Sequence, residues 1–131
     1  MDSSFLVDSS VLVAFFRQKD CFHGQAVKWL ETQRNFLISD YVLLEVSTVL
    51  QIKEGHKAAL EALNFLIFNK DIEVLKLTED ELAQTIVFFT GQKEQLSFVD
   101  SSLLILAKER GHQLATFDKG IVKAGAFLSG K

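Results

Sequence analysis

The sequence predicts an α/β protein in which helices cover both faces of a central, mainly parallel sheet. Short apolar runs typical of buried strands alternate along the chain with longer stretches of helical apolar spacing. Such alternation indicates βαβ units, so we expect a three-layer α/β/α sandwich. The chain has 131 residues, no proline and no low-complexity linker, which predicts one domain over residues 1–131.

The strands are predicted where short apolar runs end at a polar residue. They cover residues 5–7, 36–38, 72–77, 113–117 and 126–128. The helices are predicted over residues 11–16, 22–33, 41–53, 57–68, 78–90 and 97–110. Two of them open with a capping-box pattern, Thr78 with Glu81 and Ser97 with Asp100. Gly111 suits the end of the last helix.

Composition limits the possible roles of the chain. The net charge is −3, and proteins that bind nucleic acid through their general field are usually basic, so any nucleic-acid role must rest on a local site. Cys21 is the only cysteine, which excludes a disulfide within the chain and fits a reducing, cytoplasmic location. The first residues lack the pattern of a secretory signal, and the apolar runs are too short for a membrane span.

Four acidic residues adjoin apolar segments, whereas most of the other acids lie in polar stretches. Asp8 follows the first predicted strand, and Asp118 follows the fourth. Glu45 interrupts an apolar helix, and Asp100 lies in the apolar start of another. Because ligands bind at the carboxyl ends of parallel strands, we expect all four acids to reach that edge of the sheet.

Each of these acids also has a purely structural interpretation. Asp8 is a suitable helix N-cap, and Asp100 is a suitable member of a capping box. Glu45 is able to lean out of its helix toward water, and Asp118 suits a turn. The structural interpretation is favoured for each acid alone, whereas the complete set at one sheet edge favours a functional site.

Converging carboxylates repel one another, and a divalent cation relieves that repulsion. All-oxygen ligands suit Mg²⁺ or Mn²⁺. Such ions activate a water and stabilise an in-line displacement at phosphorus, so we expect hydrolysis of a phosphodiester. In this hypothesis Asp8 and Asp100 are the inner metal ligands, and Glu45 and Asp118 complete the site or orient the water.

Four segments taken in order resemble the PIN domain family, and most of all the VapC-type toxins of prokaryotic toxin–antitoxin pairs: LVDSSVL, LLEVSTVL, FVDSSLLILAKERG and LATFDKGI. The resemblance covers essentially the whole chain and implies a Mg²⁺- or Mn²⁺-dependent ribonuclease. It carries the catalytic acids onto Asp8, Glu45, Asp100 and Asp118. It also implies supporting hydrogen bonds from Ser10 and Thr116, an RNA substrate, a homodimer and a small antitoxin partner.

The chain departs from the family pattern after its third and fourth acids. Ile121 and Val122 follow the fourth acid, where members often have another polar or acidic residue, and Ser101 stands where many have alanine. Two alternatives share the fold: a PIN nuclease in RNA processing that is not a toxin, and a non-catalytic binding module. A phosphatase with an aspartyl nucleophile is disfavoured, because Ser10 stands where that class has a second acid.

Two further features leave questions for the structure. The tetrapeptide VDSS occurs at residues 7–10 and 99–102, first after a strand and then within a helix. Because the flanking sequences do not align, we predict convergence on one metal ion and not a duplication. The 12 phenylalanines fit an apolar groove or dimer face and helices packed on two sides equally well.

Overall fold

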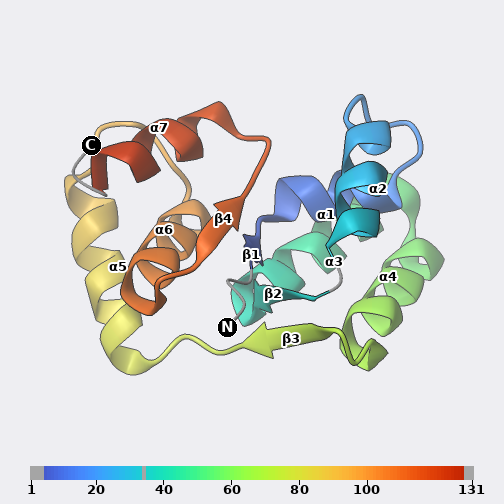
Figure 1. Ribbon diagram of the computed structural model, residues 1–131, viewed down its shortest axis with the longest axis horizontal. Helices are drawn as coiled ribbons and strands as arrows, with labels where there is room; N and C mark the ends of the chain where they lie inside the picture. The colour runs from blue at the N-terminus through green and yellow to red at the C-terminus, as the bar shows by residue number, and fades with distance from the viewer. Residues whose placement is uncertain (1–4, 34, 129–131) are drawn as a thin grey trace.

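The computed structural model describes residues 5–33 and 35–128, with four strands and seven helices in this part of the chain (Figure 1). The strands are β1 (Phe5–Val7), β2 (Phe36–Ser39), β3 (Ile72–Leu75) and β4 (Gln113–Ala115). The helices are α1 (Ser9–Phe16), α2 (His23–Thr32), α3 (Asp40–Glu54), α4 (His56–Phe68), α5 (Glu79–Gly91), α6 (Phe98–Arg110) and α7 (Lys119–Leu128).

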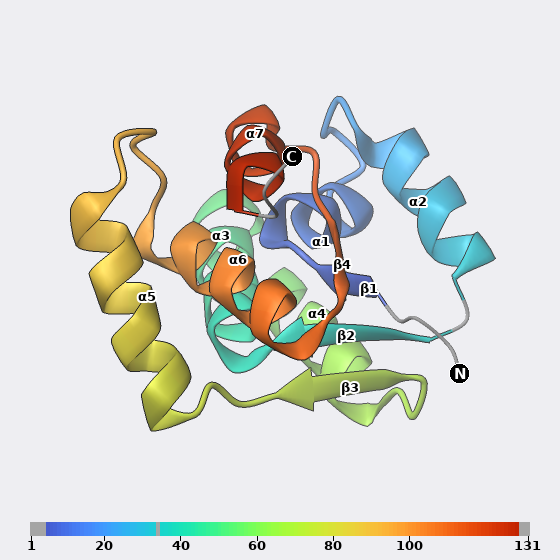
Figure 2. The same cartoon turned by 60° about the vertical axis from the view of Figure 1, so that its left-hand side comes forward.

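The strands form one parallel sheet in the order β3-β2-β1-β4. β1 pairs with both β2 and β4, and Phe5 lies opposite Phe36 on one side and Gln113 on the other. The chain moves from β1 to β3 in one direction and then crosses back to β4, so right-handed crossovers place the connecting helices on opposite faces. Figure 2 shows α6 in front of the sheet and α3 and α4 behind it. The predicted three-layer α/β/α architecture is confirmed.

The core lies between the sheet and the inner faces of these helices. Leu6 and Ile38 in the central strands are 0% exposed. On α3, Val42, Val46 and Leu50 are buried at a spacing of four residues, which places them on one helical face. Within the described residues, no helix has both the length and the apolarity that a bilayer crossing requires.

The predicted capping boxes are both present. Thr78 opens α5 together with Glu81, and Ser97 opens α6 together with Asp100. β3 ends two residues earlier than predicted. The carbonyl oxygen of Lys76 accepts a hydrogen bond from Arg110 Nη2 at 2.8 Å, and a contact between distant segments of this kind has no local signal in the sequence.

The predicted fifth strand over residues 126–128 is wrong, because these residues continue α7. Asp118 Oδ1 accepts hydrogen bonds from the backbone N–H groups of Gly120 at 2.8 Å and Ile121 at 3.1 Å, which starts the helix. Ile121 and Ala124 are buried three residues apart, as expected for a helical face. In the described part of the chain, β4 is therefore an edge strand of the sheet.

Candidate active site

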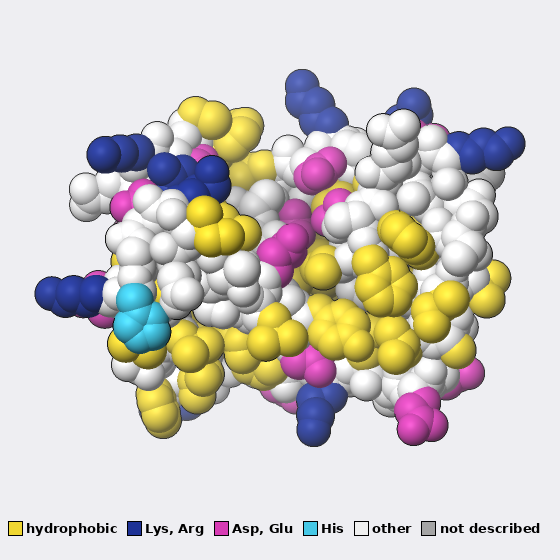
Figure 3. Space-filling view, turned by 180° about the vertical axis from the view of Figure 1, so that it is seen from behind, with side chains coloured by type: hydrophobic (Ala, Val, Ile, Leu, Met, Phe, Trp, Pro, Cys, Tyr) yellow, Lys and Arg dark blue, Asp and Glu magenta, His cyan; other side chains and the backbone are white. Residues whose placement is uncertain are grey.

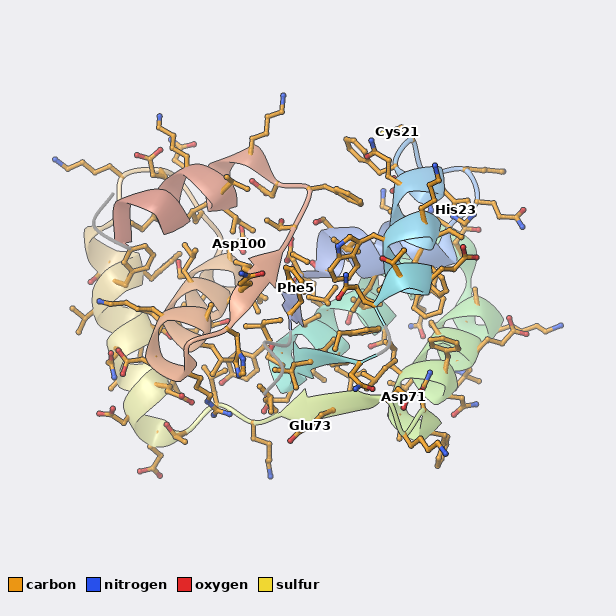
Figure 4. All side chains as sticks on the ribbon, viewed as in Figure 1. Phe5, Cys21, His23, Asp71, Glu73 and Asp100 are labelled. Carbon is orange, nitrogen blue, oxygen red and sulfur yellow. The ribbon has the colours of Figure 1, made fainter. Side chains whose placement is uncertain are left out.

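The four predicted acids lie at the N-terminal ends of four helices, at the carboxyl edge of the sheet. Asp8 caps α1 after β1, and Asp118 precedes α7 after β4. Asp100 is the third residue of α6, and Glu45 is in the second turn of α3. Figure 4 shows Asp100 near the middle of the molecule, whereas Asp71 and Glu73 lie at the outer edge beside β3.

Helix N-termini carry a partial positive charge, which favours nearby anions. Four such ends at one edge therefore moderate the repulsion among the acids without neutralising it. In the view from behind, acidic side chains gather in the middle of the face, with apolar side chains beside and below them (Figure 3).

Asp8 is the most tightly held of the four acids and is 2% exposed. Its Oδ1 accepts a hydrogen bond from the backbone N–H of Ser9 at 2.7 Å. Its Oδ2 accepts from the hydroxyls of Ser10 at 2.8 Å and Thr116 at 2.7 Å. Because these donors are neutral, they fix the carboxylate in place and leave its negative charge uncompensated.

Ser10 and Thr116 also connect the Asp8 corner to the segment that follows β4. Ser10 Oγ accepts a hydrogen bond from the backbone N–H of Phe117 at 3.1 Å. Thr116 Oγ1 accepts from the backbone N–H of Asp118 at 2.9 Å, and the two hydroxyl oxygens lie 3.4 Å apart. The start of α1 and the start of α7 are therefore held together by one hydrogen-bond network.

Glu45 is the least satisfied acid of the site. Its Oε1 is buried and has no hydrogen-bond partner among the described residues. Burial raises the pKa of Glu45, the nearby Ser9 hydroxyl opposes this, and the charges of Asp8 and Asp100 raise it further. Unpaired buried polar atoms are uncommon in folded proteins, so this oxygen is a candidate ligand for a cation.

Asp100 responds to the same neighbours. Burial is the largest cause that raises the pKa of Asp100, and the charges of Asp8 and Asp118 add to it. Hydrogen bonds with Ser97 oppose the increase. The charges of Asp8 and Asp100 act on Glu45, and those of Asp8 and Asp118 act on Asp100, so the structure brings the four acids close enough to interact.

Within the described residues, no three His, Cys, Asp or Glu side chains are already arranged to hold a metal ion. The donor set nevertheless fits a hard divalent cation, because it consists of carboxylate oxygens and includes the unpaired Oε1 of Glu45. A cation would also relieve the repulsion that raises the pKa values of Glu45 and Asp100.

Sequence reasoning missed two contacts of the site. The backbone N–H of Ser9 binds Asp8, and that of Phe117 binds Ser10. Asp8 is recognisable as an N-cap from the sequence, but an N-cap side chain ordinarily accepts from the second or third residue of the helix, so the contact with Ser9 is not predicted. The contact from Phe117 joins residues 107 positions apart and has no local signal.

The PIN domain family model matches residues 5–126. This protein therefore belongs to the PIN domain family, as the sequence resemblance predicted.

Two solved structures are similar to this chain. VapC20 of Mycobacterium tuberculosis, a toxin that cleaves the sarcin-ricin loop, matches with a TM-score of 0.86 and 28% sequence identity, covering 93% of this chain and 95% of VapC20. A toxin–antitoxin complex from Klebsiella pneumoniae matches with a TM-score of 0.62 and 19% identity, covering 88% of this chain and 87% of that one, which shows a shared fold. No curated protein matches at a significant level. The fold is that of a VapC-type PIN domain.

Proposed function

We propose that this chain is a Mg²⁺- or Mn²⁺-dependent endoribonuclease that hydrolyses RNA phosphodiester bonds, and that it is the toxin of a toxin–antitoxin pair. The observation that carries the proposal is the buried, unpaired Oε1 of Glu45 beside two other acids, Asp8 and Asp100. A binding module whose acids only capped helices would have no need of such an oxygen. The structural likeness to VapC20 supports the same activity.

In this proposal the four acids divide into two pairs. Asp8 and Asp100 are the inner metal ligands, because hydrogen bonds from backbone N–H groups orient their carboxylates: Ser9 donates to Asp8 Oδ1, and Ser97 donates to Asp100 Oδ2. Glu45 and Asp118 complete the site or orient the attacking water. The buried Oε1 of Glu45 has no hydrogen-bond partner among the described residues, so it is able to accept a proton from that water.

A bound Mg²⁺ or Mn²⁺ would supply positive charge at the phosphate and lower the pKa of a water. The residues of the chain orient the acids and transfer the protons. Ser10 and Thr116 hold Asp8 in one orientation, so no reorganisation is needed as charge develops. As water attacks phosphorus, a carboxylate takes its proton, the bond from phosphorus to the leaving sugar oxygen breaks, and that oxygen acquires a proton.

The activity is tested by incubating the protein with short RNAs in Mg²⁺, in Mn²⁺ or in EDTA. One RNA should carry the sarcin-ricin loop sequence, because VapC20 cleaves that loop. We expect cleavage with either metal and none with EDTA, and we expect Asp8→Asn to lose it. Equal cleavage in EDTA, or full activity in the variant, would contradict the metal-dependent mechanism.

Two exposed apolar surfaces support the proposed protein partners. The α4 aromatic surface consists of Phe65 and Phe68, which are 44% and 80% exposed. The half-buried rings of Phe15 and Phe16 on α1 lie 5.8 and 5.6 Å from that of Phe65. We assign the α4 aromatic surface to an amphipathic helix of the antitoxin, since aromatic side chains suit helix-in-groove binding.

The α5–α6 apolar surface consists of Ile86, Phe89 and Phe98, which are 47%, 37% and 37% exposed. The rings of Phe89 and Phe98 lie 5.3 Å apart. We assign this surface to a second copy of the chain, because a two-fold dimer buries the same patch on both subunits.

The two surfaces are matched controls for each other. Phe89→Lys is expected to turn a dimer into a monomer in light scattering and to leave antitoxin capture from the native host intact. Phe68→Lys is expected to do the opposite. If no small partner protein is captured, the result would favour an RNA-processing nuclease over a toxin. A cytoplasmic location belongs to the same proposal, and cell fractionation tests it.

A further inference from the structure

A cavity of about 300 Å³ lies between α2 and the edge of the sheet. The residues that line it include three aromatic ones, Phe5, Trp29 and Phe117, together with Gln25 and Thr116. The volume is at the lower end of the roughly 300–1,000 Å³ that small-ligand pockets have. Aromatic walls with a few polar groups are the lining that a flat, partly polar ring requires.

The cavity adjoins the acidic site through Thr116. Thr116 is one of the lining residues, and its hydroxyl donates a hydrogen bond to Asp8 Oδ2 at 2.7 Å. Phe117 is the next residue and also lines the cavity, and its backbone N–H donates to Ser10 Oγ. The cavity and the Asp8 corner of the acidic site therefore share Thr116 and the hydrogen-bond network around it.

The ring of Phe117 is held in place from outside the cavity. Phe22, which precedes α2, stacks on it with ring centroids 4.7 Å apart and an angle of 22° between the planes. Phe22 is 41% exposed, so this stack lies at the protein surface. At the other end, Phe5 and Trp29 make an edge-to-face contact at 5.1 Å.

An acidic nuclease needs contacts with RNA that do not depend on charge. The chain carries a net charge of −3, and the uncompensated acids repel phosphate. Stacking of a base on an aromatic side chain is independent of net charge and contributes about 1–3 kcal/mol per base, which is roughly fivefold to 150-fold in affinity.

We infer that this cavity, walled by Phe5, Trp29 and Phe117 and placed beside Asp8 through Thr116, binds one unpaired nucleobase of the RNA substrate. The inference rests on the proposed ribonuclease activity and adds a subsite that positions the strand. The base must leave its own stack to enter, so the preferred substrate is single-stranded or looped RNA. Gln25 offers both a donor and an acceptor to the edge of the base.

Trp29 is the only tryptophan and reports directly on the cavity. The experiment uses Asp8→Asn, so that RNA is not cut, and follows Trp29 emission while nucleoside monophosphates or a labelled single-stranded RNA are added. Anisotropy of the label measures RNA binding separately. We expect saturable quenching by both probes and about tenfold weaker RNA binding when Phe117→Ala is added.

Phe22→Leu and Phe22→Trp form the matched pair. Leucine keeps an apolar side chain without a π face and is expected to weaken RNA binding, whereas tryptophan is expected to restore it; a parallel melting curve checks that each variant is folded. Phe22→Trp adds a second fluorophore and is therefore read by anisotropy alone. Gln25→Leu is expected to reduce discrimination among the four nucleotides.

The outcomes separate the cavity from the activity. The base-binding role of the cavity is overturned if RNA binds without changing Trp29 emission, or if Phe117→Ala binds RNA with unchanged affinity. Either result leaves the nuclease proposal standing if the parent protein cleaves RNA. Nucleotides that quench Trp29 in a protein whose parent cleaves no RNA support the cavity and count against the nuclease. Absence of both quenching and RNA binding overturns the cavity together with the RNA substrate.

Discussion

Two helices of this protein begin with the same local motif and use it differently. At the start of α5, Thr78 and Glu81 exchange backbone-to-side-chain hydrogen bonds of 2.9 and 3.1 Å. At the start of α6, Ser97 and Asp100 do the same at 3.2 and 3.0 Å. Each box satisfies two N–H groups that a helix start leaves without partners. Locally the two acids are equivalent.

The tertiary neighbours of the two acids are opposite in charge. Glu81 receives hydrogen bonds from Arg110 Nε and Nη2, each at 2.8 Å, and this pairing lowers the pKa of Glu81 to about 2. Asp100 has burial and the charges of Asp8 and Asp118 instead, and its pKa is raised. Glu81, paired with a cation, links α5 to α6 and stabilises the fold. Asp100, which lies among other acids, is a candidate metal ligand.

The largest expected difference between the two boxes is in RNA cleavage. Asp100→Asn removes a proposed ligand and is expected to lower the cleavage rate by about 10²–10⁴-fold, the range for a group that acts in the transition state. Glu81→Gln is expected to stay within about twofold at a temperature where it is folded. Similar losses in both variants in a single-turnover assay would remove the functional distinction.

Stability is expected to separate the boxes in the reverse order. Arg110→Met leaves Glu81 buried without its cation and frees the Lys76 carbonyl, and we expect it to cost about 3 kcal/mol, the lower end for a buried pair, since the Arg110 side chain is 29% exposed. In EDTA, Asp100→Asn is expected to be neutral or stabilising, because it removes repulsion. Urea denaturation measures both. Clear destabilisation by Asp100→Asn would indicate a plain capping role.

Acidification is expected to remove the stabilisation that the Glu81 box contributes over a defined pH range. Its folded pKa of about 2 lies below the ordinary value of 4.5, so the stabilisation is complete above pH 4.5 and is lost as the pH falls through about 2. We expect about 2–3 kcal/mol of unfolding free energy to disappear over this range in the parent. Arg110→Met should show a much flatter profile, and an unchanged profile would contradict the assignment to this pair.

Both capping boxes and all four acids were visible in the sequence, because they depend on spacing within a few residues. Asp8 and Asp118 stood out since each follows a short apolar strand, and the topology then brought their ends to one edge. The pairing of Glu81 with Arg110 joins residues 29 positions apart and left no local trace. The same holds for the unpaired Oε1 of Glu45, which depends on how α3 packs against α1.

The two copies of VDSS show that an identical short sequence does not determine the local structure. Val7 ends a strand and Asp8 caps a helix, whereas Val99 and Asp100 lie inside the first turn of α6. The same tetrapeptide therefore adopts two different backbone conformations. Its two acids still lie close enough for the charge of Asp8 to raise the pKa of Asp100. The wrong fifth strand has the same origin, since a short apolar run such as residues 126–128 suits either a strand or a helix.

Metal binding is expected to give the smallest effect and, of the two capping boxes, to involve only the one at Asp100. A cation that binds only the folded protein adds about 1.4 kcal/mol at ten times its dissociation constant, which is a rise of a few degrees in Tm. We expect Mn²⁺ to raise the Tm of the parent and of Glu81→Gln by the same amount, and Asp100→Asn to weaken the response. The Glu81→Gln control excludes a general ionic effect, because it removes an equal charge from the other box. A flat response in the parent would favour a binding module whose acids only cap helices, and an unweakened response in Asp100→Asn would place the ion away from α6.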